Sequence, residues 1–170
     1  MRPGVVVFAV GNRSRGDDAI GPLLLERLAS WLAAGARAGE FELVDDYQLQ
    51  IEHALDLQGR RLALFIDAGC DTQAPFQFYP VASARARAAS STHRLPPQGV
   101  LDVYRQLEDA APPPSFVLCV RGERFELGEG LSAAAKAHAE AAWQQLTLLC
   151  RRPDAALWRD LANISGPVAA

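Results

Sequence analysis

The stretch that decides the fold is Val5-Val6-Val7-Phe8-Ala9-Val10-Gly11-Asn12. Its first six residues are apolar and mostly β-branched, which is typical of a strand buried on both faces in a parallel sheet. Pro22 is tolerated only in the first turn of a helix, so we expect a helix to begin near Asp18. The apolar side of this helix carries, at helical spacing, Ile20, Leu23, Leu24, Leu28, Trp31 and Leu32.

Short apolar runs alternate with helical patterns along the rest of the chain. Residues 41–44, 62–66 and 116–120 predict strands, and residues 76–79 predict an edge strand because a proline flanks them on each side. Residues 82–91 have no clear period and predict an exposed connection. Four further helices are expected. The first carries Ile51, Ala54 and Leu55, and the second carries Val100, Leu101, Tyr104 and Leu107. The third runs from Ser132, as its cap, to Leu149, and the fourth covers residues 152–162. This alternation predicts an α/β protein with a parallel or mixed sheet and helices on both faces.

Length and charge limit the possible classes of function. The 170 residues predict one domain, over residues 1–165, with a flexible tail at 166–170. Lysine and arginine number 17, and aspartate and glutamate 20, which gives a net charge of −3. This balance excludes a general electrostatic attraction to nucleic acid or to an anionic membrane. The apolar run at residues 5–10 is too short for a signal peptide or a membrane span, so we expect a cytoplasmic protein.

The cysteines and the helices limit the assembly of the chain. Cys70, Cys119 and Cys150 fit neither a zinc ribbon nor a disulfide framework, and a small buried thiol is expected at Cys119. The apolar faces of the predicted helices can all be satisfied within the chain, which predicts a monomer.

Acidic residues follow the predicted strands, at the edge where an α/β sheet binds its ligands. The loop after the first strand has the glycine spacing of a phosphate-binding loop, but Asp17 and Asp18 replace the Lys and Ser or Thr of that loop and would repel phosphate. Either carboxylate could cap the next helix or belong to a site. Asp67 ends an apolar strand, where a carboxylate is costly unless it is paired or liganded. Asp45 and Asp46 end another strand and are competing candidates.

The histidines differ in their predicted positions. His53 and His138 fall on predicted helices, where packing or surface roles are expected, whereas His93 lies in a loop, where functional residues are more frequent. Asp18, Asp67 and His93 could therefore meet at one edge of the sheet. Two carboxylates and an imidazole suit a borderline divalent ion such as nickel, zinc or iron, and three ligands leave coordination positions open.

Four motifs, in their order along the chain, resemble those of the nickel–iron hydrogenase maturation endopeptidases. The first is Val10-Gly11-Asn12 followed by Asp17-Asp18-Ala19-Ile20-Gly21, and the second is Asp67 after its apolar strand. The third is Ser91-x-His93. The fourth is a late glycine motif made by Gly122, Leu127, Gly128, Gly130, Leu131 and Ser132. The matches span most of the chain, from about residue 5 to residue 150.

The resemblance implies a three-layer α/β/α sandwich with a twisted, mostly parallel five-stranded sheet. It also implies an endopeptidase that removes the C-terminal extension of a hydrogenase large-subunit precursor after nickel insertion, and so activates the hydrogenase. Nickel carried by the precursor would serve as the recognition element, and zinc or cadmium could replace it in crystals. Catalysis and metal binding are expected at Asp18, where many relatives have Glu, and at Asp67 and His93. Substrate binding is expected at Asn12, Asp17, Gly122, Glu123, Gly128 and Gly130.

Two features leave alternatives open. Where many relatives have a glycine-rich stretch, this chain has Asp46-Tyr47-Gln48-Leu49-Gln50, which predicts a different choice of partner. A peptidyl-tRNA hydrolase would need a histidine soon after Asn12, and none occurs before His53. A non-catalytic module that binds the precursor peptide remains the main alternative, because no Ser/His/Asp nucleophile arrangement is evident. Within the peptidase hypothesis, the metal could polarise the scissile carbonyl or activate water, or an aspartate could act as general base.

Overall fold

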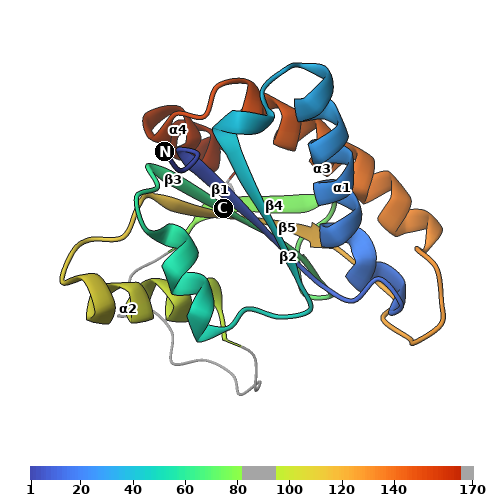
Figure 1. Ribbon diagram of the computed structural model, residues 1–170. Helices are drawn as coiled ribbons and strands as arrows, with labels where there is room; N and C mark the ends of the chain where they lie inside the picture. Colours follow the sequence, from blue (N-terminus) through green and yellow to red (C-terminus); the bar gives the residue numbers. More distant parts are fainter. Residues whose placement is uncertain (82–94, 166–170) are drawn as a thin grey trace.

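The computed structural model describes residues 1–81 and 95–165 (Figure 1). Helical and extended segments alternate along most of this chain, as the sequence predicts. The elements are β1 (Val5–Val10), η1 (Gly16–Ala19), α1 (Ile20–Ala34), η2 (Ala38–Glu40), β2 (Phe41–Asp46), η3 (Ile51–Leu57), β3 (Leu62–Gly69), β4 (Phe76–Pro80), α2 (Pro97–Glu108), β5 (Ser115–Arg121), α3 (Ala133–Arg151) and α4 (Ala155–Ser165). The segments named with η are short 3₁₀ helices.

The five strands form one mixed sheet in the order β2-β1-β3-β5-β4. Strand β1 pairs in parallel with β2 and β3, and β3 pairs in parallel with β5. Strand β4 is antiparallel to β5 and lies at the edge, as its flanking prolines predict. The predicted α/β fold, with a mostly parallel five-stranded sheet, is confirmed.

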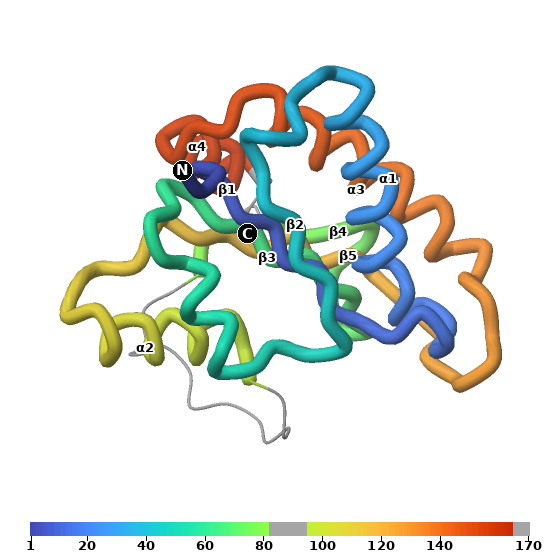
Figure 2. The backbone as a smooth tube through the Cα atoms, viewed as in Figure 1, coloured from blue at the N-terminus to red at the C-terminus, as the bar shows by residue number. Residues whose placement is uncertain are grey.

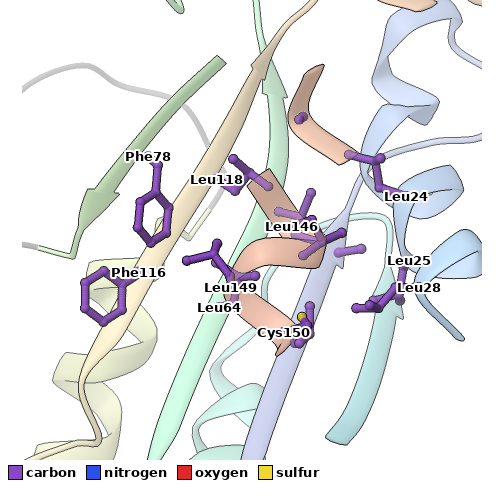
Figure 3. Packing of buried hydrophobic residues seen from close by; sticks show 14 of the residues in the cluster. Leu24, Leu25, Leu28, Leu64, Phe78, Phe116, Leu118, Leu146, Leu149 and Cys150 are labelled. Carbon is purple, nitrogen blue, oxygen red and sulfur yellow. The ribbon is translucent and has the colours of Figure 1, made fainter. Parts of the chain in front are cut away.

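Helices cover both faces of the sheet and make the expected three layers (Figure 1). On β1, Val5, Val7 and Ala9 pack with α1, α3 and α4, whereas the alternate side chains pack with η3 and α2. Figure 3 shows the first of these clusters, in which leucines of α1 and α3 meet those of β3 and β5. Each fully buried leucine stabilises the fold by roughly 1.5–3 kcal/mol, so the sheet is a rigid base for the loops at its edges.

Strands β2 and β3 extend further than the apolar runs predict. They end at Asp46 and Gly69 rather than at residues 44 and 66. The parallel pairing continues, for example from Asp67 to Cys119, although these side chains are not aliphatic. Backbone hydrogen bonding does not require an apolar side chain, so hydropathy underestimates strands that end in a polar site.

Several predicted apolar helix positions lie on the surface. Leu23, Ile51, Leu55 and Leu107 are 41%, 59%, 48% and 58% exposed. On η3, the buried residues are His53, Ala54 and Leu57, so of the three predicted apolar positions there only Ala54 is buried. The exposed connection predicted at 82–91 and the tail at 166–170 lie outside the described residues. None of the helices within residues 1–81 and 95–165 is long and apolar enough to span a membrane.

Candidate active site

The carboxyl ends of β1, β2, β3 and β5 meet at one edge of the sheet, because these strands are mutually parallel. From β1 the chain continues into α1, which covers one face, whereas η3, between β2 and β3, covers the other. Strands β1 and β3 therefore flank the point where the connections change face, the usual ligand site of such sheets. Asp18 follows β1, and Asp67 lies near the end of β3.

Asp18 is held by the loop that follows β1, residues 11–18, called here the first loop. The Asn12 N–H donates to the Asp18 carboxylate over 2.8 Å, and Asp18 is only 4% exposed. Gly11 has a φ of +148°, and a Cβ there would collide with the carbonyl oxygen of Asp18. The glycine turn predicted here is thus confirmed. The capping interpretation is wrong, because α1 begins after Ala19 with no side-chain cap.

Asp67 lies next to this loop. Its carboxylate accepts the N–H of Ala68 over 2.8 Å, and its side chain is half-buried. The start of α1 packs on both strand ends, since a Cβ on Gly21 would lie 2.7 Å from the carbonyl oxygen of Val10 and 3.2 Å from that of Ile66. The fold thus brings η1, which carries Asp18, close to β3, which carries Asp67 near its end.

Asp17 has a different environment from Asp18. It is fully buried, and its carboxylate accepts hydrogen bonds of 2.7–3.0 Å from the N–H groups of Glu123, Arg124 and Ser132 and from the Ser132 hydroxyl. Burial would raise the pKa of Asp17, but these hydrogen bonds outweigh it and lower the pKa below its ordinary value. Asp17 thus binds the chain itself, and any effect on substrate would be indirect.

The loop after β5, residues 122–132, lies along the first loop and is called here the second loop (Figure 2). The Gly122 N–H donates to the carbonyl of Gly69 at the end of β3. Further along, the Gly128 N–H donates to the carbonyl of Ser14, over 2.7 Å. Glu123 and Gly130 are exposed. The structure therefore places the predicted glycine motif beside the first loop and the end of β3.

Ser132 ends the second loop and begins α3. Its hydroxyl oxygen accepts the N–H of Ala135 over 3.1 Å, which confirms the predicted cap. The same hydroxyl donates to Asp17. One side chain thus connects the helix to the first loop.

An open pocket of about 350 Å³ lies on the other side of β1 from Asp67, between the ends of β1 and β2. Arg13 donates from one side of it to Asp45 over 2.9 Å and to Glu26 over 2.8 Å, and the hydrogen bond to Asp45 is the main cause that raises the Arg13 pKa. Tyr47 at its rim is 68% exposed. The lining residues are Gly11, Arg13, Asp45, Asp46 and Tyr47.

Two histidines have partners that sequence analysis missed. His53 Nδ1 accepts the N–H of Gln50 over 2.9 Å, and His53 Nε2 lies 3.4 Å from the Asp46 carboxylate. The three-residue spacing of Gln50 and His53 is that of a capping box and could have revealed the first contact. His138 Nδ1 lies 3.0 Å from the carbonyl oxygen of Arg121.

His93 lies outside the described residues, so the predicted trio stays a prediction. Within the part of the chain that the structure describes, no three side chains of His, Cys, Asp or Glu gather in a way that could hold a metal ion. Asp18 and Asp67 would therefore need His93 or a ligand from the substrate to complete a metal site.

Several solved structures with the same fold are named as maturation proteases of hydrogenases. The NiFe hydrogenase maturation protease HycI of Thermococcus kodakarensis superposes with a TM-score of 0.67 at 20% identity, over 87% of this chain and 92% of that chain. HybD of the same organism gives 0.65 at 20% identity, over 88% and 99%. The hydrogenase maturating endopeptidase HybD of E. coli gives 0.62 at 22% identity, over 89% and 93%.

Sequence comparison alone finds no such relationship. No protein-family model matches the chain, and no curated protein matches its sequence. The likeness therefore rests on the order of the elements and on their packing. The resemblance predicted from the four motifs is thus confirmed at the level of architecture: this chain has the fold of the hydrogenase maturation proteases.

Proposed function

We propose that this protein is an endopeptidase that removes the C-terminal extension of a nickel–iron hydrogenase large-subunit precursor. One observation carries the proposal: Asp18, in η1 after β1, and Asp67, near the end of the neighbouring parallel strand β3, lie at the same edge of the sheet, in a fold shared with solved NiFe hydrogenase maturation proteases. The first carboxylate is held in place by the Asn12 N–H. This edge of the sheet is where such folds bind their ligands.

The precursor would supply the nickel. Two carboxylates and an imidazole, from Asp18, Asp67 and His93, suit a borderline divalent ion, but such a set is weak and open. It is better suited to completing the coordination of an ion that another protein presents than to holding one alone. Nickel is then part of the substrate, and a precursor without it would not be cut.

Two routes to hydrolysis fit this site. In one, the substrate-borne nickel polarises the scissile carbonyl or activates a water molecule. In the other, the nickel only positions the peptide, and Asp18 or Asp67 acts as general base toward the water. Both routes need the two carboxylates close to the same peptide bond.

The pocket between β1 and β2 would contact the precursor outside the scissile bond. Its rim contains Tyr47, in the stretch where many relatives of the predicted family have a glycine-rich sequence. Gly11 lines the pocket, and the N–H of the next residue, Asn12, donates to Asp18, so a peptide in the pocket would pass close to the residues that hold Asp18. We expect this surface to decide which large subunit is processed. The enzyme is expected to act as a monomer in the cytoplasm.

The test is an incubation of the purified chain with nickel-loaded and nickel-free large-subunit precursor, with the products weighed by mass spectrometry. We expect loss of the C-terminal extension from the loaded form only. The His93→Ala variant should bind the loaded precursor but not cut it, whereas His138→Ala should behave as the wild type.

Each other outcome has a definite meaning. Equal cutting of both precursor forms would refute nickel recognition. Retained cutting by His93→Ala would show that the site is misassigned. Binding of the loaded precursor without any product would favour the non-catalytic module.

A further inference from the structure

The second loop and the first loop are joined through one buried carboxylate. Asp17 accepts three backbone N–H groups and one hydroxyl from residues 123, 124 and 132, which are more than 100 positions away in sequence. We call these groups the Asp17 cluster. They lie at the two ends of the second loop, so the cluster closes that loop onto η1.

Backbone contacts run alongside the cluster. The Asp17 N–H donates to the carbonyl of Arg124 over 2.7 Å, and the Gly16 N–H donates to that of Glu129 over 3.1 Å. The side chain of Arg15 also donates, through Nε, to the carbonyl of Phe125. Residues 15–17 are therefore held from several sides, and Asp18 is the next residue along the chain.

We propose that Asp17 is a positioning residue, whose carboxylate holds η1 against the second loop and so fixes the Asp18 carboxylate at the site. The inference rests on the proposed function, in which Asp18 acts on the scissile peptide. A carboxylate is suited to this task because it only accepts hydrogen bonds, and all the cluster groups that face it are donors. An asparagine would turn an NH₂ group toward some of these donors and break the cluster.

The position of the Asp18 carboxylate can be monitored by NMR in the absence of substrate. The Asn12 N–H donates to Asp18 Oδ2, and Asn12 is not part of the Asp17 cluster. A shift of Asp18 would therefore change the chemical shift of the Asn12 amide and speed its exchange with solvent. The amides of β5 serve as an internal reference, because the sheet should not move.

The experiment compares Asp17→Asn with the wild type in two measurements: the NMR signal and solvent exchange of the Asn12 amide, and the kinetics of precursor cleavage. We expect a changed Asn12 amide signal, and a kcat per folded molecule that is roughly 10- to 100-fold lower, with KM within about twofold of the wild type. Ser132→Ala, which removes one donor, should show a smaller loss, and Ser132→Thr, which keeps the hydroxyl, should recover it. Leu32→Ala, a cavity variant at the far end of α1, controls for general destabilisation.

Three results would overturn the inference. An unchanged Asn12 amide in folded Asp17→Asn would show that Asp17 does not place Asp18. An unchanged kcat per folded molecule would reduce Asp17 to a purely structural role. A raised KM with unchanged kcat would mean that the second loop binds substrate instead.

The results that would refute this inference differ from those that would refute the proposed function. If the wild type cuts no precursor, the proposed function is wrong, and the Asn12 amide still decides whether Asp17 places Asp18. If Asp17→Asn does not fold, the Ser132→Ala and Ser132→Thr pair gives the same readings.

Discussion

The first loop and the segment after β2 leave the same edge of the sheet, from adjacent strands, but they differ in what they present. In the first loop, Asp17 and Asp18 are buried, and their carboxylates accept backbone N–H groups. After β2, Tyr47, Ile51 and Leu55 are 68%, 59% and 48% exposed. A fixed acidic loop suits chemistry, and an exposed apolar segment suits recognition, so the two tasks can be separated by mutation.

The largest effect is expected at Asp18. Asp18→Asn should lower the rate of precursor cleavage by about 100-fold or more, because the side chain loses its charge and its ability to accept a proton. The product is followed by mass spectrometry. Asp71→Asn, on an exposed residue, is the matched control and should keep the wild-type rate. If both variants cut equally well, the first loop is not the catalytic region.

The turn that holds Asp18 should be the next most sensitive feature. Gly11→Ala places a Cβ against the Asp18 carbonyl at a φ of +148°, and should lower the free energy of unfolding by about 2–3 kcal/mol. Gly130→Ala, where a Cβ meets nothing within 4 Å, should change it by less than about 0.5 kcal/mol. Urea denaturation measures both. If Gly11→Ala were as stable as Gly130→Ala, the first loop would be able to shift and accommodate the added methyl group.

A smaller effect of a different kind is expected after β2. Tyr47→Ala removes an exposed ring at the rim of the pocket, and should raise KM about tenfold, equivalent to about 1.4 kcal/mol, with kcat unchanged. Leu148→Ala removes an exposed side chain on α3 and should leave KM as it is. A fall in kcat for Tyr47→Ala would contradict the hypothesis that the segment after β2 serves only in recognition and the first loop in catalysis.

Two thiols lie near the paired ends of β3 and β5 and differ in exposure, since Cys70 follows β3 and Cys119 lies in β5. Burial raises the pKa of the Cys119 thiol to about 11, and its sulfur lies 2.9 Å from the Thr72 hydroxyl, whereas Cys70 is exposed. At pH 8 Cys119 is therefore protonated and unreactive. Brief treatment with iodoacetamide should label Cys70 and leave Cys119 and Cys150 free, as read by peptide mass mapping. Labelling of Cys119 would show that this part of β5 is open to solvent.

Much of the fold follows from local patterns. The six apolar residues of β1 are predicted to the residue, and the edge position of β4 follows from its two prolines. Surface leucines cannot be separated from core leucines in this way. Leu23 and Leu24 are both in α1, yet only Leu24 is buried, because exposure depends on which element packs against the helix.

The candidate site was less predictable than the fold. The acidic residues at the strand ends are found from sequence because parallel strands share one edge. The role of Asp17 cannot be found in this way, since its donors lie in the second loop and no local spacing connects them. Whether His93 meets Asp18 and Asp67 stays a prediction, because His93 lies outside the described residues.

The positions of the three tryptophans have a practical consequence. Trp31 and Trp143 meet edge to face between α1 and α3, and Trp158 of α4 is fully buried against Phe78 and Phe116. All three belong to the helical layer on a single face of the sheet, and none lies in the first loop, in the second loop or after β2. Intrinsic tryptophan fluorescence of the purified chain will therefore report unfolding of the core and not local changes in the loops, which makes it a suitable measure of the folded fraction of each variant before the precursor is added.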